Sequence, residues 1–154
     1  MALLIRGKSL CPICGKVIAK GDEVFSFPAL ITNPADRLHE FNDSIFHSDC
    51  FYSHPLSERA EVVIGEWEAR SSLNECAISG REITGPDDFF VFPFMTDSGP
   101  LAEFNFACCS REALKEWRGL PSIVSEIRML LDSGEWEESA LLEVVEQLKT
   151  IAGD

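Results

Sequence analysis

The chain has 154 residues, of which 45% are hydrophobic, so it can build one ordinary domain or two small ones around a buried core. Its 13 basic and 26 acidic residues give a net charge of −13, which disfavours nonspecific binding to nucleic acid because phosphate backbones are also negative. Uninterrupted apolar runs of about 18 residues are lacking, which argues against a membrane-spanning helix.

The six cysteines are expected to be reduced. The first residues lack the long apolar run of a signal peptide, so the sequence predicts a cytoplasmic protein. In that compartment, a Cys-x-x-Cys pair indicates a metal or redox motif rather than half of a disulfide framework.

An internal repeat organises the first two thirds of the chain. Residues 11–30 align without a gap to residues 76–95, and both copies share a cysteine, two isoleucines, a glycine, an aspartate, two phenylalanines and a proline at matched positions. Further on, residues 46–50 match residues 106–110 less closely, if the second copy has a loop that is five residues shorter. Each copy is predicted to form a cysteine-containing knuckle, a strand with alternating phenylalanines, a loop, a second short strand and a helix.

Helical periodicity links and follows the two copies. Apolar residues at helical spacing predict a helix over about 55–73, between the copies. After the second copy, Ser110 is a candidate N-cap for a helix that ends near Gly119. Two further helices, over about 121–132 and 136–152, are separated by a short turn and are predicted to form an antiparallel hairpin.

Two short motifs have the spacing of metal ligands. Cys11 and Cys14 lie three residues apart, and Gly15 after them can adopt the positive φ of a tight turn. His47 and Cys50 repeat this separation at the predicted start of a helix. Because a structural zinc needs four nitrogen or sulfur ligands, Cys11, Cys14, His47 and Cys50 are predicted to hold one structural Zn²⁺.

These motifs resemble a known family. A Cys-x-x-Cys knuckle, a hairpin and then the run Phe-His-Ser-Asp-Cys-Phe over 46–51 look like a treble-clef zinc finger, and the last run is similar to the end of the first finger of a LIM domain. The 32 residues between Cys14 and His47 exceed the usual LIM spacing, and no cysteine closely follows Phe51. The resemblance therefore implies a treble-clef-like shape rather than a LIM domain.

Other interpretations of these residues stay open in the sequence. His54, four residues after Cys50, is an alternative ligand to His47, which we prefer because it repeats the two-ligand spacing and follows an aromatic residue. Buried free cysteines or a redox pair are further alternatives for Cys11 and Cys14.

The second copy is predicted to be metal-free. In the alignment Cys14 is replaced by Ser79, His47 by Ala107 and Cys50 by Ser110, so four ligands cannot be assembled there. Its richer content of phenylalanine fits a repeat that is stabilised by a hydrophobic core in place of a metal. Cys108 and Cys109 are interpreted as small buried residues.

The predicted fold class is α+β, with tandem treble-clef-like repeats followed by a helical hairpin. The expected domains are a zinc-binding repeat with its linking helix (1–74), a degenerate second repeat (75–120) and a C-terminal helical hairpin packed on the repeats (121–154).

A binding role is favoured over catalysis. Three cysteines and a histidine close the coordination sphere of zinc, and no nucleophile motif or phosphate-binding loop is present, so we expect no enzyme activity. The acidic charge favours a protein partner with a basic surface, for example a nuclease-like toxin that an immunity protein or antitoxin would inhibit.

The alternative is a zinc-finger adaptor or transcriptional regulator that contacts nucleic acid. Its contact residues would be those of the basic N-terminal knuckle, Arg6, Lys8, Lys16 and Lys20. Nucleic acid is the less favoured partner because of the overall charge, and the sequence leaves the oligomeric state open.

Overall fold

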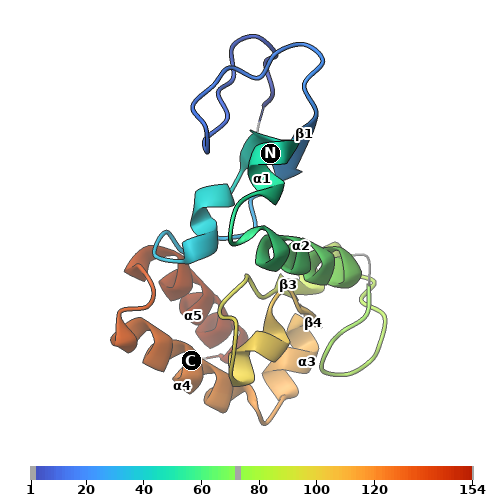
Figure 1. Cartoon of the computed structure of the whole chain (residues 1–154). Coiled ribbons are helices and arrows are strands. Elements are labelled where there is room, and N and C mark those ends of the chain that lie inside the picture. The colour runs from blue at the N-terminus through green and yellow to red at the C-terminus, as the bar shows by residue number, and fades with distance from the viewer. Residues whose placement is uncertain (1–2, 72–73, 154) are drawn as a thin grey trace. The chain divides into compact units, whose positions relative to one another are not determined.

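The computed structural model describes residues 3–71 and 74–153 and has an α+β fold, as predicted. It contains two small antiparallel β-hairpins, each followed by helices (Figure 1). The chain divides into two compact units, the first made of Met1–Ile31 and Arg37–Gly65 and the second of Thr32–Asp36 and Glu66–Asp154. No helix within the described ranges is both long and apolar enough to cross a membrane.

The first unit is built on one hairpin. Strand β1 (Val24–Phe27) pairs with β2 (Ser44–His47), and the 3-10 helix η1 (Arg37–Phe41) lies in the loop between them. The short helix α1 (Ser48–Tyr52) follows β2 directly, and then α2 (Ser57–Ser71) begins. Helix α2 confirms the predicted linking helix, whose last two expected residues, 72–73, lie outside the described ranges.

Aromatic side chains form the core of this unit. Phe27, Phe41, Phe46 and Phe51 are completely buried. The Phe41 ring meets the rings of Phe46 and Phe51 edge-on, with centroids 5.6 and 5.4 Å apart, which is a favourable geometry for aromatic pairs. A five-residue helix such as α1 is not stable by itself, so tertiary packing of Phe51 has to hold it in place.

The second unit places a second hairpin among helices. In chain order its elements are η2 (Pro86–Asp88), β3 (Phe89–Val91), η3 (Pro100–Phe104), β4 (Cys108–Ser110), α3 (Arg111–Glu116), α4 (Leu120–Ser133) and α5 (Glu138–Ala152). Strand β3 pairs with β4, and α4 and α5 are in contact (Figure 1). The predicted C-terminal helical pair is therefore confirmed, and Gly134 turns the chain between its helices with a φ of 76°.

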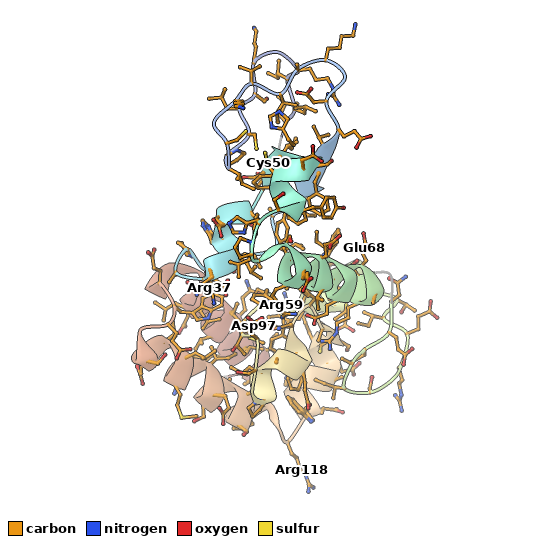
Figure 2. The ribbon with its side chains drawn as sticks, viewed as in Figure 1. Arg37, Cys50, Arg59, Glu68, Asp97 and Arg118 are labelled. Atoms are coloured by element: carbon orange, nitrogen blue, oxygen red, sulfur yellow. The ribbon has the colours of Figure 1, made fainter. Side chains whose placement is uncertain are left out.

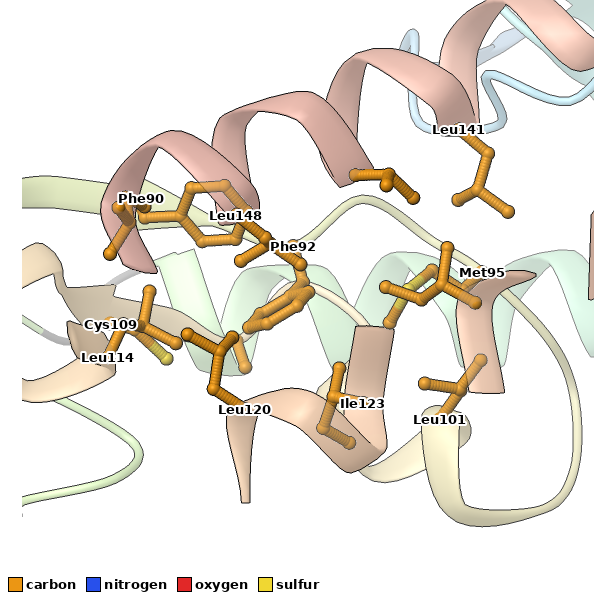
Figure 3. Packing of buried hydrophobic residues seen from close by; sticks show 14 of the residues in the cluster. Phe90, Phe92, Met95, Leu101, Cys109, Leu114, Leu120, Ile123, Leu141 and Leu148 are labelled. Carbon is orange, nitrogen blue, oxygen red and sulfur yellow. The ribbon is translucent and has the colours of Figure 1, made fainter. Parts of the chain in front are cut away.

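One hydrophobic core unites the hairpin and helices of the second unit. Figure 3 shows Phe90 and Phe92 between the helices, with Leu120 of α4 on one side and Leu148 of α5 on the other. All four side chains are at most 4% exposed. The Ser110 hydroxyl accepts a hydrogen bond from the Ala113 amide at 3.2 Å, which confirms the predicted N-cap of α3.

The two hairpins are preceded by turns with the same geometry. Leu10 is bridged to Val17 in the first copy, as Glu75 is to Glu82 in the second. Within each turn a glycine amide donates to the carbonyl of the cysteine four residues earlier, at 2.8 Å in both copies. The glycines, 15 and 80, have φ values of 68° and 66°, the left-handed conformation that favours glycine.

The strand register corrects the second half of the sequence alignment. Val24 pairs with His47 and its counterpart Phe89 pairs with Ser110, so Ser110 corresponds to His47. The second loop is therefore shorter by two residues, and the expected difference of five is wrong. The reason is that the two loops share a feature that sequence similarity does not reveal. Asp43, three residues before Phe46 of β2, has a φ of 49°, and Phe106, three residues before Cys109 of β4, has a φ of 58°.

An asparagine occupies the same place in each of these loops. Asn42 Oδ1 accepts the Ile31 amide at 2.9 Å. Its counterpart Asn105 Oδ1 accepts the Met95 amide at 2.8 Å, and Asn105 Nδ2 donates to the Thr96 carbonyl at 2.7 Å. Asn105 is 3% exposed, so these bonds are shielded from water and hold the loop against the strand.

Replacing Asn105 with alanine should lower the free energy of unfolding by about 1–3 kcal/mol, because the buried amide of Met95 loses its partner. Chemical denaturation followed by circular dichroism measures this change. The exposed Asn74→Ala is the control and should stay within about 0.5 kcal/mol of the wild type. Equal stability of all three proteins would contradict the role given to Asn105.

Candidate metal centre

Four side chains from three parts of the first unit meet at one point. Cys11 and Cys14 come from the turn between Leu10 and Val17, and His47 ends β2. Cys50 lies in α1, as Figure 2 shows. Their ligand atoms all lie within 4.8 Å of one another. The structure thus brings together the four residues that the sequence singles out.

The distances between these atoms suit a tetrahedral metal ion. His47 Nδ1 lies 3.4 Å from Cys14 Sγ and 4.0 Å from Cys50 Sγ. Bonds of about 2.3 Å to sulfur and about 2.0 Å to nitrogen place tetrahedral ligand atoms about 3.5 Å apart. Four such donors leave no coordination position for water, so the donor set fits a structural zinc ion.

The turn that carries two of the ligands is fixed by backbone hydrogen bonds. The Cys11 amide donates to the Lys16 carbonyl at 2.9 Å, and the Gly15 amide donates to the Cys11 carbonyl at 2.8 Å. Cys11 is completely buried, whereas Cys14 is exposed. The backbone of the turn therefore fixes where Cys11 and Cys14 lie relative to each other.

The electrostatics of the cluster favour a cation at its centre. Burial of Cys11 acts to raise its pKa, but hydrogen bonds from the Cys14 and His47 backbone and from the His47 ring outweigh it and lower the pKa to about 6. Burial of Cys50, together with the neighbouring Cys14 and Cys11 sulfurs, raises its pKa to about 11. A divalent ion held by these residues would neutralise the thiolates, and Cys50 would have to lose its proton to act as a ligand.

A carboxylate orients the histidine. Asp22 Oδ2 lies 3.2 Å from His47 Nε2, the ring nitrogen that faces away from the thiols, and also accepts the Ala19 amide at 2.6 Å. A carboxylate on the outer nitrogen fixes the tautomer that leaves Nδ1 free for the metal. Sequence reasoning did not give Asp22 this role, because the contact joins residues 25 positions apart.

His54 is engaged elsewhere. Its Nε2 lies 3.5 Å from Glu40 Oε1, and its Nδ1 accepts the Leu56 amide at 3.3 Å. The ring also packs edge-on against Phe41, with centroids 4.9 Å apart. These contacts favour His47 over His54 as the fourth ligand.

The corresponding place in the second unit keeps one thiol. By the strand register, Cys76 corresponds to Cys11, and the remaining three positions hold Ser79, Ser110 and Ala113. Cys76 is 1% exposed, and its sulfur accepts the Ser110 amide at 3.3 Å. The hydrogen-bond frame is kept there, but the side chains that would complete a tetrahedral sulfur site are replaced.

No family model, curated protein or solved structure matches this chain closely enough to indicate a relationship. The site is therefore interpreted from its own geometry.

Changing Cys11 to serine should abolish stoichiometric zinc binding and destabilise the first unit by several kcal/mol, because three ligands bind zinc much more weakly than four. Elemental analysis of purified protein and thermal melts with and without a chelator measure both effects. Cys76→Ser is the matched control, since Cys76 occupies the same turn position in the second copy, and it should keep about one zinc per chain. Loss of zinc from both variants, or from neither, would contradict the assignment.

Changing Asp22 to asparagine should weaken zinc binding about ten- to hundredfold, because the neutral amide supports the metal-bound imidazole less strongly. Competition with a chromophoric chelator gives the affinity. The neighbouring exposed Glu23→Gln makes the same change in charge and should leave the affinity unaltered. An equal effect of the two variants would show that overall charge, and not the contact with His47, is responsible.

Proposed function

We propose that the first unit is a treble-clef-like finger whose single Zn²⁺ is bound by Cys11, Cys14, His47 and Cys50. The proposal is supported by the convergence of the four ligand atoms next to a hairpin and a helix. Its role is structural, because four protein ligands leave no open position for a substrate or for an activated water molecule.

The function that this scaffold supports best is binding of a protein partner with a basic surface. The observation that carries it is the distribution of charge between the units. The first unit has six basic and seven acidic residues, a net charge of −1, whereas the second has seven basic and 19 acidic residues, a net charge of −12. Such a concentrated field attracts a basic partner and speeds its association.

Part of this negative charge lines a hollow of about 540 Å³ in the second unit. We call it the acidic hollow, and its acidic lining residues are Glu82, Asp88, Glu112 and Glu116. Arg81 and Trp117 also line it. Carboxylates around an aromatic ring suit a lysine or arginine side chain, which can pair with the acids and lie against the indole.

A more specific form of this proposal is an immunity or antitoxin protein that covers the basic cleft of a nuclease-like toxin. Nucleases bind phosphate through basic grooves, so a rigid acidic surface can occupy the same groove. This form explains why a strongly acidic unit would be joined to a metal-stabilised one without a catalytic site.

The alternative is an adaptor or regulator that contacts nucleic acid through the basic knuckle. Lys8, Lys16 and Lys20 are exposed there, which favours this role. Arg6 is less available because its guanidinium donates to the Ala19 and Asp22 carbonyls at 2.9 and 3.0 Å. Binding to DNA or RNA that falls steeply with salt would support the regulator over the inhibitor.

Reversing two charges of the acidic hollow, Glu82→Lys with Glu116→Lys, should weaken binding of the basic partner at least about tenfold, because like charges would then face each other. Affinity purification from the source cells with mass spectrometry identifies the partner, and titration calorimetry gives its affinity. The control, Asp132→Lys with Glu135→Lys, changes the charge of the same unit equally at exposed positions outside the hollow. An acidic partner, or equal weakening by both pairs, would contradict the proposal.

A further inference from the structure

Exposed aliphatic side chains are concentrated in the N-terminal segment. The described part of the chain has ten large hydrophobic residues that are well exposed, and five of them fall within residues 3–17. Single exposed apolar residues are ordinary, but a group of them marks a contact surface. We call this group the aliphatic tip, and its members are Leu3, Ile5, Leu10, Ile13 and Val17, between 39% and 79% exposed.

Part of this group surrounds a shallow hollow. Leu10 and Val17 are paired across the antiparallel bridge, so their side chains emerge on the same face of the turn. Leu3, Leu10 and Pro12 line one hollow of about 430 Å³, which Ile45 of β2 also lines. Ser9, Asp43 and Ser44 complete the lining, so the hollow offers a partner side chain apolar contacts on one part of its wall and polar groups on the other.

The backbone under the aliphatic tip is held in place. The Ile18 amide donates to the Ser9 carbonyl at 2.8 Å, and the Gly7 amide donates to the Ile18 carbonyl at 2.8 Å. Ile18 is buried in the first unit, and the metal cluster at Cys11 lies beside it in the same turn. Because the surface is ordered before binding, a partner loses little free energy to ordering it.

The charge around the tip is opposite to that of the whole protein. Residues 3–21 carry four basic side chains and no acidic one, although Asp43 also lines the hollow. Basic side chains next to exposed aliphatic ones suit a partner segment that combines acidic residues with apolar ones. Stacking of nucleic acid bases or anchoring at a membrane surface usually involves aromatic side chains, and residues 3–21 contain none.

We propose that the aliphatic tip is a second docking surface. It binds an acidic segment of a partner protein, whose apolar side chain packs against Leu3 and Leu10, with Val17 next to Leu10 across the bridge. This surface does not depend on the acidic hollow of the second unit. Its partner has the opposite charge to the basic protein proposed above, so the two contacts are separate.

The test is a selection of random 12-residue peptides displayed on phage against the full-length, zinc-loaded protein. We expect the enriched peptides to share at least two acidic residues and one aliphatic or aromatic residue. The most enriched peptide, made synthetically, should bind Leu10→Ser with Val17→Ser at least about tenfold more weakly by fluorescence polarisation, since each lost apolar contact costs roughly a factor of ten. Both positions are exposed, so zinc content and thermal stability should be unchanged.

The control is a double variant at exposed apolar positions outside the aliphatic tip. Val62→Ser with Met129→Ser also removes two exposed apolar side chains and should leave peptide binding intact. Failure to enrich any peptide, enrichment of basic peptides, or equal binding by both double variants would overturn the proposal. Three other interactions would also overturn it if the Leu10→Ser with Val17→Ser variant lost them. These are binding to a 20-nucleotide single-stranded DNA, binding to vesicles containing phosphatidylserine, and self-association in sedimentation. Each would show that the surface binds something other than an acidic protein segment.

Discussion

The convergence of three cysteine sulfurs and one imidazole nitrogen is the constraint around which the first unit is arranged. These ligand atoms lie within 4.8 Å of one another, and hydrogen bonds lower the pKa of Cys11 whereas burial and the neighbouring sulfurs raise the pKa of Cys50. A cation at this point would favour the thiolate form of both cysteines, and Asp22 lies against the outer nitrogen of the imidazole. Such a cation would link the turn, the end of β2 and the start of α1 at one point.

The second unit keeps the same backbone pattern with a different source of stability. Its turn has the hydrogen bonds and the left-handed glycine of the first, and Cys76 still accepts an amide from the strand end. The other ligand positions have become Ser79, Ser110 and Ala113, while α4 and α5 extend the core around Phe92. A metal holds four residues together without much buried area, whereas a hydrophobic core needs additional helices to do the same.

The surfaces of the two units differ as much as their cores. The first unit is nearly neutral and presents aliphatic side chains beside lysines, and the second carries almost the whole negative charge. Long-range attraction would guide the basic partner, and apolar contacts would supply most of the affinity for the acidic one.

The sequence by itself determined the features that depend on local spacing. Pairs of ligands three residues apart, the turn at Gly15, the cap at Ser110 and the apolar faces of the last two helices can all be read from neighbouring residues. Tertiary structure alone decided what depends on residues far apart in the chain. The pairing of Phe89 with Ser110 corrected the repeat, because strand register is set by the loop and its left-handed residue rather than by similarity. The contact of Asp22 with His47 spans 25 residues, and no local pattern specifies that distance.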